Sequence, residues 1–255
     1  MNTRSSTSHQ GKSGQSGSAA TQSHLTGRSS KRQTKRWQPR QRRQESVSGH
    51  NAVSPAEWEI LTRQQALTEA QCGHYNTAIA LFTEILTRNP LSARDYNNRG
   101  LVYFQSGRTD KAIADYNQAL ELNPSLDSAY NNRANYFASQ GQYLEAVLDY
   151  DAALELNPDN VRAWINQGIT FRDMQMYERA IESFDVAIGL GCLQSHVYSE
   201  RGRTHHLWGD WNCAIADYKR SLSYLQLPNA TAGNVARLLQ QVETWMNDLL
   251  SPLAQ

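Results

Sequence analysis

The sequence predicts an all-α fold, a solenoid of stacked helix pairs, from two sets of small residues. Alanine recurs every 34 residues, at Ala78, Ala112, Ala146, Ala180 and Ala214. A second small residue lies twelve positions before each of these alanines, at Ala66, Gly100, Ala134, Gly168 and Gly202. A repeated helix pair needs small side chains where its two helices cross, because the backbones approach closely there.

The unit from Ala93 to Leu126 shows the repeat most clearly. With Ala93 as position 1, small residues stand at positions 8, 20 and 27, large ones at 4, 11 and 24, and proline at 32. These residues are Tyr96, Gly100, Tyr103, Ala112, Tyr116, Ala119 and Pro124. Large side chains fill the space between successive helices, and the proline, which lacks an N–H, marks the end of the second helix.

This pattern resembles the tetratricopeptide repeat (TPR), and successive units keep its register without insertions. The resemblance implies a right-handed superhelical solenoid of five helix pairs within residues 53–228. The units are 59–92, 93–126, 127–160, 161–194 and 195–228.

Both ends of the array carry helix signals. The segment Ser54–Glu57 (SPAE) is typical of a capping box with proline at the first helical position, so the first helix should begin here. In residues 229–255, apolar side chains recur at helical spacing and predict an amphipathic helix that caps the last repeat. Alternatively, Trp245 and Met246 form a dimer surface, so we expect a monomer or a weak dimer.

Residues 1–52 differ in composition from the rest of the chain. The first 50 residues hold ten Lys or Arg and one acid, and large apolar residues are scarce. The other 205 residues hold 15 basic and 23 acidic ones, so a near-neutral chain divides into a part of +9 and a part of −8. A segment with few apolar residues cannot offset the entropy of ordering, so we expect a disordered basic tail.

Seven basic residues cluster in this tail: Lys31, Arg32, Lys35, Arg36, Arg40, Arg42 and Arg43. Clustered cations release counterions from a polyanion, so they predict binding to nucleic acid or to an anionic membrane surface. Trp37 could stack on a base or enter a lipid interface. The alternative is an arm that is solvated or that contacts the protein's own Asp115, Asp149, Asp151 and Glu155.

The sequence contains no motif of a catalytic site: no Gly-rich phosphate loop, no nucleophile elbow and no HExxH. We therefore expect neither an enzyme nor a bound cofactor. Cys192, His196, His205, His206 and Cys213 could suggest zinc, but the repeat register argues against it. His205 holds packing position 11, and His196 and His206 lie about 15 Å apart along one helix. We expect no metal site.

The expected location is the cytoplasm. There is no run of 18 apolar residues and no secretory signal, and the three cysteines form no CxxC pair. The alternative is a plastid, because a start rich in serine and arginine is compatible with an organelle transit peptide.

In TPR proteins the first helix of each repeat lines a concave groove, mainly through positions 2, 5, 6, 9 and 12. Position 6 is asparagine in three consecutive units, at Asn98, Asn132 and Asn166. Other groove positions add Asn97, Asn131 and Asn135. A carboxamide both donates and accepts hydrogen bonds, so this row is similar to the asparagine ladder with which some TPR proteins hold an extended peptide. Alternatively, asparagine merely tolerates a solvated helix face.

The same groove positions hold five arginines against one acid, Glu200. The arginines are Arg63, Arg94, Arg162, Arg172 and Arg203. Guanidinium pairs bidentately with carboxylate, so the groove should favour an acidic peptide. The carboxylate clamp of chaperone-type TPR domains is not reproduced, because Leu67, Ser128 and Asn132 stand where it needs other side chains.

Together these patterns predict a non-enzymatic interaction scaffold that binds an extended, acidic peptide segment, with assembly of a larger complex as one such role. The alternative is an adaptor whose basic tail docks on nucleic acid or an anionic membrane surface while the solenoid holds a protein cargo.

Overall fold

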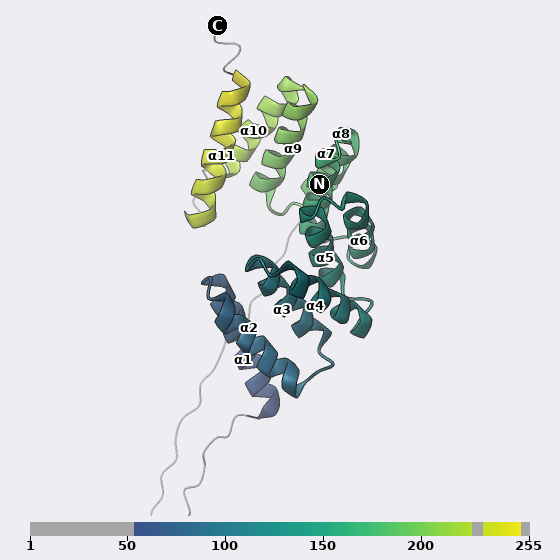
Figure 1. Cartoon of the computed structure of the whole chain (residues 1–255). Helices are drawn as coiled ribbons and strands as arrows, with labels where there is room; N and C mark the ends of the chain where they lie inside the picture. Colours follow the sequence, from purple (N-terminus) through teal and green to yellow (C-terminus); the bar gives the residue numbers. More distant parts are fainter. Residues whose placement is uncertain (1–53, 226–231, 251–255) are drawn as a thin grey trace, which may run out of the picture. The chain divides into compact units, whose positions relative to one another are not determined.

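The computed structural model describes residues 54–225 and 232–250, and within them the chain forms eleven α-helices and no strand (Figure 1). The helices are α1 (Pro55–Gln71), α2 (Tyr75–Arg88), α3 (Ala93–Gln105), α4 (Thr109–Leu122), α5 (Asp127–Ser139), α6 (Tyr143–Leu156), α7 (Val161–Asp173), α8 (Tyr177–Gly189), α9 (Gln194–Trp208), α10 (Trp211–Leu225) and α11 (Ala232–Leu250). The predicted all-α solenoid is therefore confirmed. None of the described helices is long and apolar enough to cross a membrane.

The helices pack as consecutive pairs. Each helix contacts the next along the chain, from α1 to α11. In addition, α3 contacts α5, α5 contacts α7 and α7 contacts α9. The first helices of these repeats therefore lie next to one another, and their outward side is called the first-helix face below.

Small residues and aromatic rings meet where the two helices of a repeat cross. All five alanines at position 20 are fully buried. A Cβ added to Gly168 would lie 2.9 Å from Phe184 Cε1 and 3.1 Å from the backbone oxygen of Ala180, so the crossing leaves no room for a methyl group in its present packing. The rings at position 24, such as Tyr116 and Phe184, are fully buried, which explains why the sequence repeats them.

The turn inside each repeat has a residue in the left-handed region at a constant place. It is glycine at Gly73, Gly107, Gly141 and Gly209, with φ between 74° and 90°. In the fourth repeat the same place holds Gln175, with a φ of 61°. A residue with a Cβ adopts this backbone conformation only at a cost in free energy, so Gln175 is a point of backbone strain.

Both ends of the array carry the helix features that the sequence predicts. Ser54 Oγ accepts a hydrogen bond from the Glu57 backbone N–H over 3.2 Å, and Glu57 Oε2 accepts one from the Ser54 N–H over 2.9 Å, which confirms the capping box. At the other end, α11 buries Val242 and Leu249 in one cluster with Ala214 and Tyr218 of α10. The amphipathic cap of the last repeat is therefore present.

Candidate peptide-binding face

The predicted asparagine row lies on the first-helix face, but its amides bind one another in a register that crosses the repeats. Asn132 Nδ2 on α5 donates to Asn97 Oδ1 on α3 over 2.9 Å. Asn166 Nδ2 on α7 donates to Asn131 Oδ1 on α5 over 3.5 Å. Position 6 of one repeat is thus paired with position 5 of the repeat before it. A further contact, 3.5 Å from Asn131 Nδ2 to Asn132 Oδ1, joins the two pairs.

These contacts orient the amides before any ligand arrives. A carboxamide nitrogen has two N–H groups, and the contact with Asn97 uses one of those on Asn132. Asn131, Asn132 and Asn166 are only half-buried, whereas Asn97 is 5 % exposed. The row therefore has an inner part that links helices and an outer part that is accessible to another chain.

The other two asparagines have separate surroundings. Asn135 Oδ1 accepts a hydrogen bond from the hydroxyl of Tyr150 over 2.7 Å, so its carbonyl is held by the second helix of its own repeat. Asn98 lines a hollow of about 460 Å³ between α1 and α3. Leu67, Leu101 and Gln105 share this hollow, so its walls are both apolar and polar.

The predicted arginines divide into two groups. Arg63 donates to both carboxylate oxygens of Asp95, over 2.6 and 2.8 Å, and Asp95 is fully buried. The hydrogen bond with Asp95 is also the main cause that raises the pKa of Arg63. Arg172 donates to Glu200 Oε2 over 2.6 Å, and both residues lie on the first helices α7 and α9. These two guanidinium groups are ion-paired within the solenoid.

The remaining arginines are more available. The guanidinium of Arg203 lies over the ring of Trp245, 5.4 Å from its centroid, so it contacts the capping helix. Arg94 and Arg162 are exposed, and neither forms a salt bridge within the described residues. The positive charge that the first-helix face can offer to a ligand therefore rests chiefly on Arg94 and Arg162.

A second ladder, absent from the sequence-based expectations, joins the two helices of several repeats. An arginine at position 7 binds both oxygens of an aspartate at position 23. The pairs are Arg99–Asp115, Arg133–Asp149 and Arg201–Asp217, all with contacts of 2.7 or 2.8 Å. Each arginine also reaches position 25 of the preceding repeat, at Thr83, Asn117 and Asp185 respectively. The signal was visible in the sequence, because the first two pairs lie 34 residues apart and the third follows 68 residues after the second.

The fourth repeat departs from this ladder. Gln167 and Ser183 replace the arginine and the aspartate, and Gln167 Nε2 donates to Asp151 Oδ1 of the preceding repeat over 2.7 Å. Beside them lies an open hollow of about 560 Å³ that Glu155 and Glu182 also line. In the fourth repeat the arginine–aspartate pair is therefore replaced by a pair of neutral side chains, Gln167 and Ser183.

The predicted tail site falls outside the described residues. This applies to Lys31, Arg32, Lys35, Arg36, Arg40, Arg42 and Arg43. Of the four acids considered as alternative contacts for the tail, Asp115 and Asp149 are bound by arginines of the ladder, whereas Asp151 and Glu155 line the hollow of the fourth repeat.

These features define the class of protein: an all-α repeat solenoid with a row of polar side chains along adjacent first helices. Family models of the TPR match three overlapping segments. A model described as "TPR repeat" matches residues 100–141, and two described as "Tetratricopeptide repeat" match residues 128–160 and 149–182. The chain therefore carries tetratricopeptide repeats, which the family models match over residues 100–182.

Solved structures with the same fold include MamA and PilW. A crystal structure of MamA superimposes with a TM-score of 0.54 and 18 % identity, over 66 % of this chain and 92 % of MamA. PilW, described as a widely conserved type IV pilus biogenesis factor, gives a TM-score of 0.63 and 20 % identity, over 76 % of this chain and 91 % of PilW. No curated protein sequence matches the chain. At these identities the two structures share the fold of this chain.

Proposed function

We propose that the protein is a non-enzymatic scaffold that binds an extended peptide segment of another protein along the first-helix face of α3, α5 and α7. The observation that carries this proposal is the inter-repeat register of the amides, in which Asn132 is held by Asn97 and Asn166 by Asn131. Side chains held in place before binding lose less conformational freedom when the ligand arrives.

An extended peptide suits this row because its backbone offers N–H and C=O groups at regular intervals. The outer N–H groups of Asn132 and Asn166 can donate to peptide carbonyls, and Asn98 can contribute from the adjoining hollow. Arg94 and Arg162, exposed and without a salt bridge in the described part of the chain, give a preference for acidic side chains. We place this activity in the assembly of a larger complex, a setting in which a rigid scaffold holds a segment of one component.

The test is a triple substitution, Asn98→Ala, Asn132→Ala and Asn166→Ala, in the full chain. Twelve-residue peptides selected from a random display library on the wild-type protein serve as ligands, and their affinity is measured by fluorescence anisotropy. We expect at least tenfold weaker binding, which corresponds to about 1.4 kcal/mol. The substitutions Arg94→Glu and Arg162→Glu should weaken the binding of acidic peptides more than that of neutral ones.

A matched control replaces three asparagines elsewhere, Asn76, Asn212 and Asn247, which are exposed on α2, α10 and α11. The control should bind like the wild type, and circular dichroism should show equal helix content in all variants. A folded triple variant with unchanged affinity would exclude the asparagine row as the binding site.

A further inference from the structure

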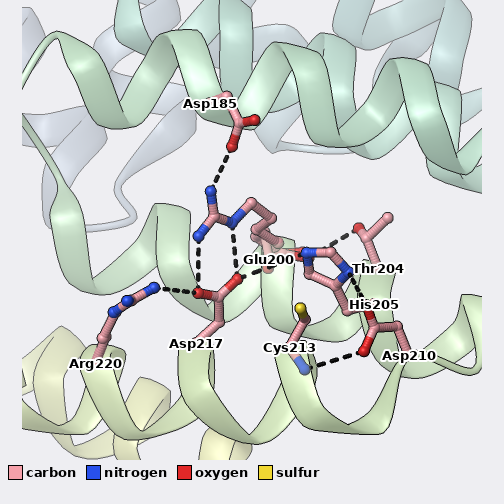
Figure 2. A network of polar contacts seen from close by, with 9 residues as sticks. Asp185, Glu200, Thr204, His205, Asp210, Cys213, Asp217 and Arg220 are labelled. Carbon is pink, nitrogen blue, oxygen red and sulfur yellow. Dashed lines mark hydrogen bonds and ion pairs between the residues drawn. The ribbon is translucent and has the colours of Figure 1, made fainter.

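Three side chains with metal-binding groups meet at the turn between α9 and α10. His205 lies in the last turn of α9, Asp210 in the connection and Cys213 in the first turn of α10. One ligand atom of each lies within 4.8 Å of the other two. His205 Nδ1 is 3.8 Å from Asp210 Oδ2. Figure 2 shows the three side chains converging from the two helices and their turn.

His205 is placed as a ligand would be. Its side chain is 12 % exposed, and its Nδ1 is buried without a hydrogen-bond partner among the described residues. An imidazole nitrogen left in this way loses the hydrogen bonds that it would make in water. His205 Nδ1, which lies near Asp210 and Cys213, is therefore free to bind a ligand.

The other nitrogen of the ring faces a fixed carboxylate. His205 Nε2 lies 4.0 Å from Asp217 Oδ2, and the Asp217 side chain is 3 % exposed and held by Arg201 over 2.7 Å. Metal-binding histidines usually direct their second nitrogen at a carboxylate or carbonyl, which orients the ring and raises its basicity. Asp217 is in position to do this after a small movement of the ring.

Asp210 and Cys213 complete the set. Asp210 Oδ1 accepts the Cys213 backbone N–H over 3.1 Å, and the Cys213 thiol is a further hydrogen-bond partner of this carboxylate, so the two side chains already face each other. The Cys213 residue is exposed, so an ion can reach its sulfur from solvent. Imidazole, carboxylate and thiolate together are a donor set that suits Zn²⁺.

We propose that His205 Nδ1, Asp210 Oδ2 and Cys213 Sγ bind one Zn²⁺ ion, with solvent or a partner's side chain as the fourth ligand. With bonds of about 2.0–2.3 Å, the ligand atoms of a tetrahedral site lie roughly 3.3–3.8 Å apart. A nitrogen and an oxygen ligand lie at the short end of this range, so the His205–Asp210 distance of 3.8 Å has to shorten by roughly 0.3–0.5 Å. The sulfur, within 4.8 Å of the other two ligand atoms, has to move by about 1.3 Å at most.

The charges of such a site balance. Binding removes the proton of the Cys213 thiol to solvent, so one thiolate and one carboxylate neutralise the dication. The positive end of the α10 dipole opposes a cation here, and these two anionic ligands offset it. Asp217 does not compete as a ligand, because Arg201 and Arg220 already bind its oxygens.

The proposed site overlaps only in part with the residues that the sequence suggested for zinc. Of the residues considered there, only His205 and Cys213 belong to the cluster, and the third ligand, Asp210, was not considered. A bound ion would fasten the end of α9 to the start of α10 in the repeat that α11 covers.

The test measures metal binding to the untagged full-length chain. Isothermal titration should give one tight Zn²⁺ site, and Co²⁺ should show the thiolate charge-transfer band and the visible bands of tetrahedral coordination. Mg²⁺, a hard cation, should not bind. Cys213→Ser and His205→Phe should each weaken Zn²⁺ binding at least 30-fold and abolish the charge-transfer band. Phenylalanine is used because other repeats hold Phe137 and Phe171 at this packing position.

The matched control is the double variant Cys72→Ser and Cys192→Ser, which removes the other two cysteines, both exposed. It should bind Zn²⁺ like the wild type. Zn²⁺ should also raise the melting temperature of the wild type and of this control, and leave that of Cys213→Ser unchanged. Absence of one tight site in the wild type, or equal affinity in Cys213→Ser, would overturn the proposal.

Discussion

Ser183 Oγ donates a hydrogen bond of 3.1 Å to Gln167 Oε1 at the place where three other repeats hold an arginine–aspartate ion pair. Both residues are 4 % exposed. The fourth repeat shows that a neutral pair is compatible with the fold, so the charged pairs are not required by the helix crossing itself. The contribution of a charged pair to the free energy of unfolding can be measured by replacing its residues.

The ladder predicts that removing one partner of an ion pair lowers the free energy of unfolding more than replacing both partners does. Arg133→Ala leaves the Asp149 carboxylate, 10 % exposed, without its bidentate partner, and should lower the free energy of unfolding by roughly 2–4 kcal/mol. The double substitution Arg133→Gln and Asp149→Ser copies the fourth repeat and should recover most of that loss. Urea denaturation followed by circular dichroism measures both. Equal stability of the single and double variants would contradict this account.

The strained turn of the fourth repeat predicts a stabilising substitution. Gln175→Gly should raise the free energy of unfolding by about 1 kcal/mol, because glycine adopts a φ of 61° without a Cβ clash. The matched reverse change is Gly141→Ala, at the same place in the third repeat, and it should lower stability by a similar amount. A destabilised Gln175→Gly variant would mean that the glutamine side chain, rather than the backbone, decides this position.

Two buried tyrosines at the same repeat position should respond differently to loss of the hydroxyl. The Tyr116 hydroxyl is buried without a hydrogen-bond partner in the described part of the chain, so Tyr116→Phe should be neutral or stabilising. The Tyr150 hydroxyl donates to Asn135 over 2.7 Å, so Tyr150→Phe should cost about 1 kcal/mol. Chemical denaturation of the two variants side by side is the measurement, and equal effects would refute the distinction.

The same rings predict a loss of stability in alkali. Burial raises the pKa of Tyr116 and Tyr150 above 10.0, and it raises that of Tyr218 to about 12. The unfolded chain therefore releases these phenolic protons first, at pH values near 10, while the folded chain retains them. The contribution of these tyrosines to the free energy of unfolding should be constant below that pH and fall as the pH rises through and above it. Urea midpoints across this range should fall less steeply for Tyr116→Phe, and an unchanged slope would oppose this assignment.

The fold could be predicted from the sequence because each repeat places residues of the same size at the same helix contacts. Gly168 opposite Phe184 and the alanines at position 20 are local consequences of a helix crossing, so a 34-residue period reveals them directly. The capping box at Ser54 was equally readable, because it depends on residues three positions apart.

The site was less predictable, because it depends on contacts between repeats. The pairing of Asn132 with Asn97 spans 35 residues, one more than the repeat, and a comparison of equivalent positions does not reveal it. The expected positive charge of the first-helix face likewise depends on the groove positions alone. Asp95, at a position outside that set, binds Arg63, so charge counting overstated the guanidinium groups available to a ligand.

The packing of α11 on Ala214 and Tyr218 also bears on how such a chain can lengthen. The surface of α10 that would accept a sixth helix pair is occupied by Val242 and Leu249. A unit added by gene duplication at this end would have to displace the cap and expose its apolar side. A 34-residue unit duplicated between two internal repeats would instead meet the same neighbours on both sides, so growth of the array is expected to be internal, with the α11 cap inherited unchanged.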